Sequence, residues 1–315
     1  MESDLSPDWL SLPHGSQFCE LMLPPNGGVR GSTGDLRRWF YQLRHHTQWW
    51  RRQAVGRRIL GSDYPELGLD PNGRFGACLK VVAMGDKNGV PFAQEAHEYM
   101  LKSRGLLGDD VVLRFGDSVP LQDMWQGAYV DDCVISLKVP LSRMNCCPGH
   151  CETCVHCQGD GGRLPDVDAT EKMVEAYAAF DAARSEEKAT RFQSVFTAWG
   201  SEVNGRRGIV HVSLDKRRQL SRLCYAVASH GRSTKAVLQS LVGSVIHPFM
   251  HCRHLMSTLS ETYTFVMNLN TESESALPAA VCDELLSCSL VLACAYTGIR
   301  AQVSTTVSAT DATPL

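Results

Sequence analysis

The spacing of apolar residues predicts different structures in the two halves of the chain. Between residues 35 and 141, short apolar runs are separated by glycine, aspartate and asparagine, which is typical of strands and turns. We predict strands at residues 78–83, 111–115 and 128–139, and a short helix at residues 91–101. Residues 1–34 are rich in glycine, proline and serine without an apolar period, so we expect a loop there, with a poor strand at residues 27–34.

From residue 213 onward the apolar period becomes helical. Leu220, Leu223 and Val227 share one helical face, and Gly231 stands where a C-terminal cap is expected. The other elements predicted after residue 160 are a helix capped by Asp168 and Glu171, helices from Ser233 to Pro248, around residues 255–263 and from Pro278 to Gly298, and a strand over residues 299–310. These elements predict an α+β fold, in which a sheet-and-helix domain precedes a helical bundle.

Composition argues for a globular protein with reduced cysteines. Hydrophobic residues make up 43% of the 315 residues and charged residues 21%, which argues against disordered and fibrous classes. No apolar run approaches the roughly 20 residues of a membrane helix. The first residues lack a secretory signal, so we expect a protein of the cytoplasm or nucleus, without a membrane partner. Thirteen cysteines, an odd number, favour free or metal-bound thiols over a disulfide scaffold.

The formal net charge of −3 gives no general reason to expect a nucleic-acid partner. Positive charge is nevertheless concentrated locally. The two clusters are Arg30, Arg37, Arg38, Arg44, Arg51, Arg52, Arg57 and Arg58, and then Lys216, Arg217, Arg218 and Arg222. Solvated helix faces would explain both, but a surface that follows phosphates needs only local charge.

Two adjacent acids, Asp131 and Asp132, lie inside an apolar, strand-forming run. Unpaired carboxylates are costly to bury, so strands rarely carry them without a cation nearby. At a hairpin turn such a pair can leave the sheet and bind a divalent metal. Because successive strand residues point in opposite directions, we expect only one of the two to face the metal directly. Taken alone, the pair could also be a turn between two exposed strands.

Four segments follow one another along the chain: GDLRRWFYQL (34–43), MGDKNGVPFAQ (84–94), AYVDDCVI (128–135) and TAWGSEV (197–203). Their order resembles that of the motifs of reverse transcriptases. They resemble, in turn, the first palm acid with its aromatic pair, the Gly-Pro-Gln element, the Tyr-Val-Asp-Asp turn, and the primer-grip hairpin. Lys188 stands where the family places a basic residue before that hairpin. Residues 307–313, with Asp311, are similar to the first strand and first acid of the ribonuclease H domain that follows in retrotransposon polyproteins.

The resemblance implies a nucleotidyltransferase of the DNA/RNA polymerase superfamily that uses Mg²⁺ or Mn²⁺. Asp35 and Asp131 would be the metal ligands and Asp132 a further ligand or supporting acid, because two-metal transfer needs carboxylate oxygens. The partners implied are an RNA template, a DNA primer and a deoxynucleoside triphosphate.

The resemblance also gives roles to residues around the acids, each with an ordinary alternative. Phe40 would be the steric gate beneath the sugar, or a core side chain. Gly85 and Gln94 would lie against the nucleotide and template, or only begin a helix. Lys188 would protonate the leaving pyrophosphate, or be a solvated lysine. Trp199 and Gly200 would contact the primer end, or only pack within their hairpin. The residues expected to contact the duplex backbone are Lys216, Arg217, Arg218 and Arg222, for which a solvated helix face is the alternative.

The implied domains are a loop-rich start with incomplete fingers (1–34), a palm-like domain (35–205), a helical thumb or connection (206–298) and the start of a ribonuclease H-like domain (299–315). The short N-terminal segment, the Val90-Pro91 pair in place of Ser-Pro, and the position of Asp311 depart from the family pattern. We therefore expect a fragment, or a degraded copy, of a retroelement polyprotein.

Residues 146–157 form a cysteine-rich insertion in the palm-like domain. Overlapping Cys-x-x-Cys pairs can wrap one zinc ion in a tight knuckle. The preferred ligands are Cys147, Cys151, Cys154 and Cys157, although the usual second pair at a distance is absent. A metal-free cysteine-rich insertion is the alternative.

Three functions are therefore open. The first is an RNA-directed DNA polymerase, for which the three retained acids argue. The second is an inactive retroelement remnant that only binds nucleic acid through its basic helices and cysteine knuckle, for which the missing fingers argue. The third is an unrelated metal-dependent phosphotransferase, which would leave the primer-grip-like hairpin and the helical bundle unexplained.

Overall fold

The computed structural model describes residues 11–145, 163–269, 273–302 and 306, and the chain divides into two compact units. Unit 1 comprises residues 11–13, 31–137 and 163–192 of the described chain. Unit 2 comprises residues 14–30, 138–145, 193–269, 273–302 and 306 of the described chain. The hairpin of β7 (Val195–Ala198) and β8 (Ser201–Asn204), predicted as part of the palm-like domain, thus groups with the helical part.

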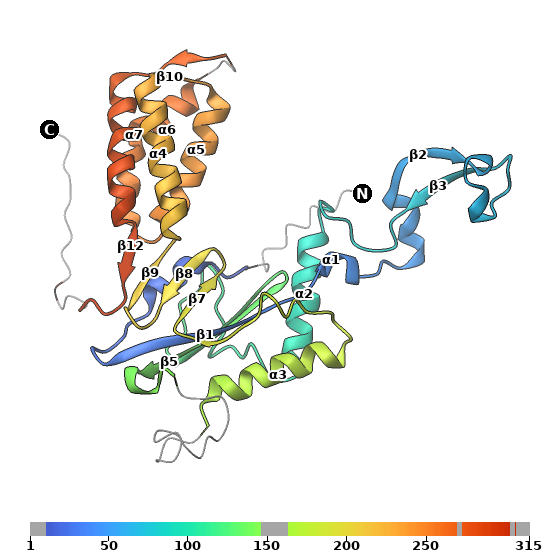
Figure 1. Cartoon of the computed structure of the whole chain (residues 1–315), viewed down its shortest axis with the longest axis horizontal. Helices are drawn as coiled ribbons and strands as arrows, with labels where there is room; N and C mark the ends of the chain where they lie inside the picture. The colour runs from blue at the N-terminus through green and yellow to red at the C-terminus, as the bar shows by residue number, and fades with distance from the viewer. Residues whose placement is uncertain (1–10, 146–162, 270–272, 303–305, 307–315) are drawn as a thin grey trace. The chain divides into compact units, whose positions relative to one another are not determined.

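Unit 1 is built on a sheet with the strand order β4-β5-β1-β6, in which β4 and β5 pair antiparallel. Strands β1 and β5 of this sheet are labelled in Figure 1. Helices α2 and α3 contact each other and share an apolar core with the sheet, formed by residues such as Met100, Ile135 and Met173. A second sheet pairs β2 with β3. The elements are β1 (Gly27–Asp35), α1 (Trp39–Gln42), β2 (Ala54–Leu60), β3 (Arg74–Cys78), α2 (Gly89–Lys102), β4 (Met124–Tyr129), β5 (Asp132–Pro140), α3 (Pro165–Ala179) and β6 (Thr190–Gln193).

Unit 2 contains a sheet of order β12-β9-β8-β7, a short β10–β11 pair and helices around a second core. Its elements are β7 (Val195–Ala198), β8 (Ser201–Asn204), β9 (Ile209–His211), α4 (Leu214–His230), β10 (Arg232–Ser233), α5 (Lys235–Phe249), α6 (Ser260–Asn268), β11 (Ser275–Ala276), α7 (Ala279–Val291) and β12 (Tyr296–Gly298). Short 3₁₀ turns connect the elements of both units: η1 (Gly15–Glu20), η2 (Thr47–Gln53), η3 (Gly61–Asp63), η4 (Pro65–Leu67), η5 (Leu141–Arg143), η6 (Arg253–Leu259) and η7 (Leu292–Cys294).

Strand β1 corrects the expectation of a loop before Asp35. Its positions are almost all buried, so the strand shows no polar alternation that the sequence could reveal. Glycine has a packing role here. A Cβ on Gly34 would lie 2.9 Å from the Met173 sulfur, so the missing side chain lets α3 approach the strand closely.

Two other predicted strands were wrong. Residues 111–115 form no strand, and only Val112 makes an isolated bridge, to Gln126. The apolar residues of that run fill the core from a loop, as buried Leu113 shows. Residues 79–83 likewise follow β3 instead of forming a strand. The hairpin within residues 128–139 and the helix over residues 91–101 were predicted correctly.

The helices of unit 2 follow the predicted order. Gly231, at φ +68°, ends α4 in the left-handed conformation expected of a C-terminal cap. Helix α5 runs through Pro248 and ends one residue later, and α7 ends at Val291, well before Gly298. The predicted capping box of α3 was wrong, because Leu164 is the N-cap and Asp168 lies inside the first turn. Among the described helices, none is both long and apolar enough to cross a bilayer.

Candidate active site

Strands β4 and β5 form a hairpin whose two-residue turn is Val130 and Asp131. Tyr129 pairs with Asp132 across the base of the turn. Val130 has φ +54°, a left-handed conformation that glycine adopts easily and β-branched residues rarely adopt. Such strain persists only where surrounding contacts impose it, and it is frequent at functional sites.

Helix α2 holds this strained turn in place. Gln94 accepts a hydrogen bond from the Val130 backbone N–H at 2.7 Å and donates one to the Ala128 carbonyl at 2.8 Å. The Nδ1 of His97 lies 3.0 Å from the Val130 carbonyl, to which it must donate. Both polar groups of the Val130 peptide are therefore bound by side chains of one helix.

His97 connects the turn to α3. It is fully buried, and its Nε2 lies 2.8 Å from the Tyr177 hydroxyl, which donates to it when Nδ1 carries the ring proton. Burial lowers the pKa of His97 to about 4, so the ring stays neutral near pH 7. His97 was not among the residues predicted from the sequence. The available signal was its position three residues after Gln94, on the same face of the predicted helix.

Asp35 ends β1, the strand beside β5 in the sheet. The backbone N–H of Leu36 donates to the Asp131 carbonyl at 2.9 Å, and that of Ser185 donates to the Asp35 carbonyl at 2.9 Å. The segment after α3 therefore runs along the end of β1. As a result, the Lys188 Nζ lies 3.0 Å from the Asp35 carboxylate.

The four charged groups influence one another strongly. Burial, and then the negative charges of Asp131 and Asp35, raise the pKa of Asp132 to about 7, and a hydrogen bond joins Asp132 to Asp35. Burial and the charge of Asp35 also raise the pKa of Asp131. The hydrogen bond to Asp35 raises the pKa of Lys188. The sequence ranked Asp131 above Asp132, but it is Asp132 that contacts Asp35 directly.

The donor chemistry of this cluster fits Mg²⁺ or Mn²⁺, because both take carboxylate oxygens. Within the described part of the chain, however, no three His, Cys, Asp or Glu side chains are placed to hold one ion. A proton on Asp132, hydrogen-bonded to Asp35, and the Lys188 ammonium instead offset two of the three negative charges of the acids. A divalent cation therefore requires that proton to leave and Lys188 to move aside. The lysine can do so because its side chain is 63% exposed.

The three residues predicted to contact the nucleotide have different surroundings. Phe40 is half-buried against the core, and its ring lies 3.2 Å from where a Cβ on Gly89 would stand. Gly85 has φ +99° with open space around it, so its loop needs glycine for conformation and not for close packing. Gln94 is only 2% exposed and its amide is used inside the protein. Contacts of these residues with a nucleotide stay predictions. The hydrogen bonds of Gln94 show that it holds the β4–β5 turn.

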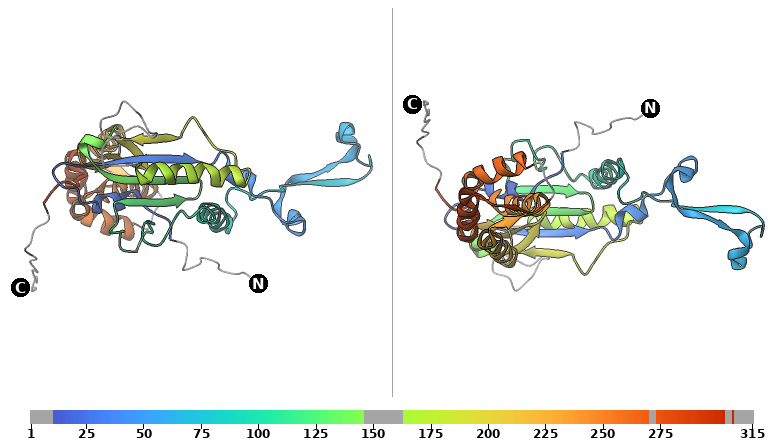
Figure 2. Two further views of the ribbon diagram at one scale, coloured as in Figure 1. Left: turned by 90° about the horizontal axis from the view of Figure 1, so that it is seen from below. Right: turned by 90° about the horizontal axis from the view of Figure 1, so that it is seen from above.

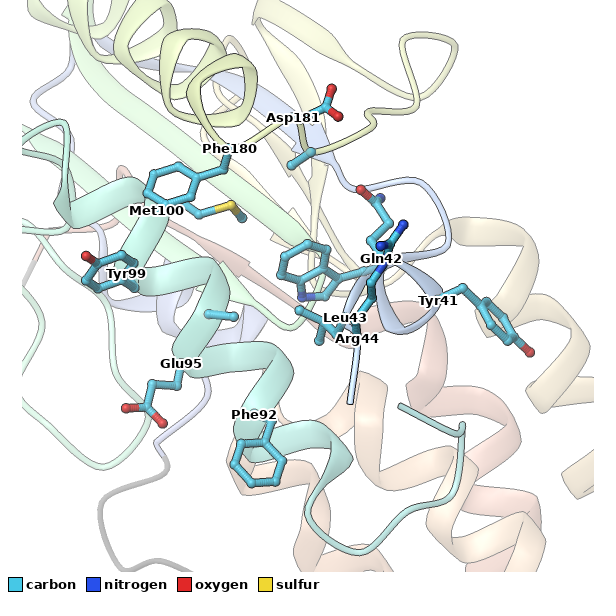
Figure 3. A pocket seen from close by; sticks show the side chains of 13 residues that line it. Tyr41, Gln42, Leu43, Arg44, Phe92, Glu95, Tyr99, Met100, Phe180 and Asp181 are labelled. Atoms are coloured by element: carbon cyan, nitrogen blue, oxygen red, sulfur yellow. The ribbon is translucent and has the colours of Figure 1, made fainter. Parts of the chain in front are cut away.

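A pocket of about 780 Å³ lies beside α2, apart from the acids (Figure 3). Its walls include aromatic side chains of α1, α2 and the end of α3, such as Tyr41, Phe92 and Phe180. Neither the three acids nor Lys188 lines this pocket. It is therefore not the cavity of the candidate catalytic cluster.

In unit 2, Trp199 and Gly200 form the two-residue turn of the β7–β8 hairpin. Both have positive φ, +47° and +82°, which a right-handed hairpin twist favours but which is unusual for tryptophan. A Cβ on Gly200 would meet the His247 ring at 3.1 Å, so the glycine lets the turn approach α5. The indole N–H of Trp199 is buried without a hydrogen-bond partner among the described residues.

The basic residues of α4 do not form one surface. Lys216, Arg218 and Arg222 are exposed, as a nucleic-acid contact requires. Arg217 is 7% exposed and donates hydrogen bonds to the carbonyls of Val212, Leu292 and Ala293. The prediction that Arg217 contacts a duplex was wrong, because the helical period turns this position inward, where its guanidinium caps the end of α7.

We expect Arg217→Met to lower the free energy of unfolding by about 2–4 kcal/mol, because it leaves buried carbonyls without a charged donor. Arg218→Met, one position along on the exposed face, should change it by less than about 0.5 kcal/mol. Urea denaturation of both variants measures the difference. Equal stabilities would contradict the structural role of Arg217.

The raised pKa of Asp132 predicts a pH dependence of stability. The folded protein keeps this proton up to about pH 7, whereas the unfolded chain loses it near pH 4, so stability falls as pH rises between these values. In a metal-free buffer at pH 8, Asp132→Asn should be more stable than the wild type by on the order of 2–4 kcal/mol. The gain should shrink toward pH 4. The exposed carboxylate variant Asp117→Asn should show no such gain in thermal denaturation, and a similar gain there would refute the coupling.

Several predictions lie outside the described residues. These are the zinc ligands Cys147, Cys151, Cys154 and Cys157, Asp311, and most of the strand expected over residues 299–310. They stay predictions.

Comparison with known proteins identifies the fold. No protein-family model and no curated protein matches the sequence. A foamy viral protease-reverse transcriptase (dRH) in complex with double-stranded DNA superposes with a TM-score of 0.53 and 12% identity, over 90% of this chain and 38% of that chain. A foamy viral protease-reverse transcriptase in complex with an RNA/DNA hybrid superposes with a TM-score of 0.52 and 12% sequence identity. That superposition covers 90% of this chain and 29% of that chain. This chain thus spans less than half the length of those proteins, and it has an α+β fold of the reverse-transcriptase type.

Proposed function

We propose that this chain is the polymerase part of a retroelement reverse transcriptase, which adds nucleotides to a DNA primer on an RNA template. The observation that carries the proposal is the coupling of Asp35, Asp131, Asp132 and Lys188 at the adjoining ends of β1 and the β4–β5 hairpin. The fold supports it, and so do the nucleic acids bound by its structural neighbours.

In this proposal Asp35 and Asp131, with Asp132 beside them, would hold Mg²⁺ or Mn²⁺. A bound ion would supply charge that activates the primer hydroxyl and offsets the charge of the departing pyrophosphate. Gln94 and His97 of α2 hold the Val130 backbone next to Asp131, which helps the carboxylates to keep their spacing during the reaction. Lys188, held protonated beside Asp35, is suited to donate a proton to the leaving group.

Some of the other predicted contacts also belong to this proposal, but that of buried Arg217 does not. Phe40 lies beneath the incoming sugar, and Trp199 and Gly200 steady the primer end. Lys216, Arg218 and Arg222 contact the duplex backbone by phosphate and shape. The retrotransposon origin and the ribonuclease H-like end at residues 299–315 rest on the sequence resemblance.

A second candidate function is nucleic-acid binding without catalysis. One observation favours it: among the described residues a proton and Lys188 offset two of the three acidic charges, and no three ligands are placed around one ion. A remnant that had lost metal binding could keep such a cluster. The two candidates differ in whether Mg²⁺ enables nucleotide incorporation.

The experiment is single-nucleotide incorporation by the purified chain on a 5′-labelled DNA primer annealed to an RNA template. The polymerase proposal expects Mg²⁺- or Mn²⁺-dependent extension by the templated nucleotide only, and none with EDTA. Primer–template binding without extension at any divalent cation concentration would overturn it in favour of the remnant.

A further inference from the structure

We propose that a basic ribbon formed by η2, β2, β3 and Lys80 binds a single nucleic-acid strand. The two strands pair with each other and with no other strand of the described chain (Figure 1, Figure 2). This inference does not depend on polymerase activity, because it concerns a surface that holds none of the catalytic candidates.

The ribbon carries six exposed cations. They are Arg51, Arg52, Arg57, Arg58, Arg74 and Lys80. Within the described residues none of them forms an ion pair with a carboxylate. Clustered cations repel one another unless an anionic partner is near, and arginine forks match phosphate oxygens in particular.

The acids of this segment lie elsewhere and are partly engaged. Asp63, Glu66 and Asp70 occupy the connection between β2 and β3. Asp63 accepts the Leu60 N–H, and Asp70 accepts the Asn72 N–H, so both stabilise local turns. The six cations thus lie on the strands and on the segments next to them, and one acid from outside the ribbon, Asp86, accepts a hydrogen bond from Gln53 of η2 at 2.9 Å. Arg30, near this cluster in sequence, is fully buried and does not belong to the surface.

Two tryptophans give the ribbon a surface on which bases can stack. Trp49 is 42% exposed and has the Arg52 guanidinium 4.5 Å from its ring centroid, and the Lys80 ammonium lies 4.9 Å from the ring of Trp50. Aromatic rings interleaved with cations are typical of surfaces that bind unpaired strands, where bases are free to stack. Paired bases offer no such faces, so the tryptophans favour a single strand over a duplex.

Both faces of the ribbon are open. Nearly every residue of β2 and β3 is exposed, and an isolated two-stranded sheet is at best marginally stable in water. A ligand that binds the folded ribbon would stabilise it by mass action. The seven residues of β2 extend about 23 Å at roughly 3.3 Å per residue, which is long enough to follow several nucleotides.

The test measures binding of a fluorescein-labelled 20-nucleotide RNA of mixed sequence to the full chain by anisotropy, over a range of salt concentrations. Arg57→Gln/Arg58→Gln should raise the Kd about fivefold or more at 0.1 M salt and reduce the slope of log Kd against log salt by roughly 1.4. The control Arg104→Gln/Lys172→Gln removes two exposed, unpaired charges elsewhere in unit 1 and should change the Kd less than twofold. Thermal denaturation confirms that both variants are folded.

A second variant separates single-strand from duplex binding. Trp49→Leu should weaken binding of the single strand and leave binding of a blunt RNA duplex of the same sequence unchanged. The proposal is overturned if the Arg57→Gln/Arg58→Gln variant has the same Kd as the control variant. It is also overturned if that variant loses equal affinity for single strand and duplex while Trp49→Leu changes neither. If the wild-type chain binds the RNA but incorporates no nucleotide, that result counts against the polymerase proposal alone.

Discussion

Asp131→Asn is expected to reduce Mg²⁺-dependent primer extension by about 1,000-fold while the protein stays folded. Asn keeps the shape of Asp131 and the backbone hydrogen bond that its carbonyl accepts from Leu36. It removes one of the negative charges that would attract the cation. Because burial already raises the pKa of Asp131, losing the charge should not lower the free energy of unfolding.

The measurement is the rate of single-nucleotide incorporation under saturating primer–template. Asp117→Asn is the matched control, because it makes the same change at an exposed carboxylate of unit 1. Both variants should bind primer–template as the wild type does. An Asp131→Asn protein that extends primers at the wild-type rate would show that catalysis, if present, does not use this cluster.

Gln94→Leu should lower the free energy of unfolding by about 2–5 kcal/mol, the second large effect. Leucine fits the buried site in size but leaves the Val130 N–H and the Ala128 carbonyl without partners, at about 1–3 kcal/mol each. It also releases the strained Val130 conformation, so the hairpin should relax. Extension should therefore fall together with stability.

Glu95→Leu is the control for Gln94→Leu, because Glu95 is the next residue of α2 and is exposed. It should leave stability within about 0.5 kcal/mol of the wild type. Urea denaturation of the two variants makes the comparison. If Gln94→Leu unfolds at the same urea concentration as Glu95→Leu, then α2 does not hold the turn.

Local pattern predicted the hairpin and most helices because their signals are short-range. The Asp-Asp pair interrupts an apolar run at the turn, and Gly231 ends α4 as its left-handed φ allows. Strand β1 could not be predicted in this way. Its glycines lower strand propensity, and their use, close packing such as Gly34 against Met173, depends on a helix about 140 residues away in the chain.

The charged residues of the candidate site were predicted from the sequence, but the residue that connects its turn to α3 was not. The order of motifs named Asp35, Asp131, Asp132 and Lys188, and the structure brings these four together. The role of His97 depends on contacts with a distant turn and with α3, which no local pattern encodes. Arg217 shows the opposite error, since a basic run was taken as one exposed surface although the helical period buries one of its members.

Divalent-cation binding at pH 8 tests the central claim, that Asp35, Asp131 and Asp132 form a metal site, most directly. The measurement is an electron paramagnetic resonance titration of Mn²⁺ with wild type, Asp131→Asn and Asp117→Asn. We expect wild type and Asp117→Asn to bind Mn²⁺ alike and Asp131→Asn to bind it at least about tenfold more weakly. Equal binding by all three proteins, or no Mn²⁺ binding by the wild type, would contradict it.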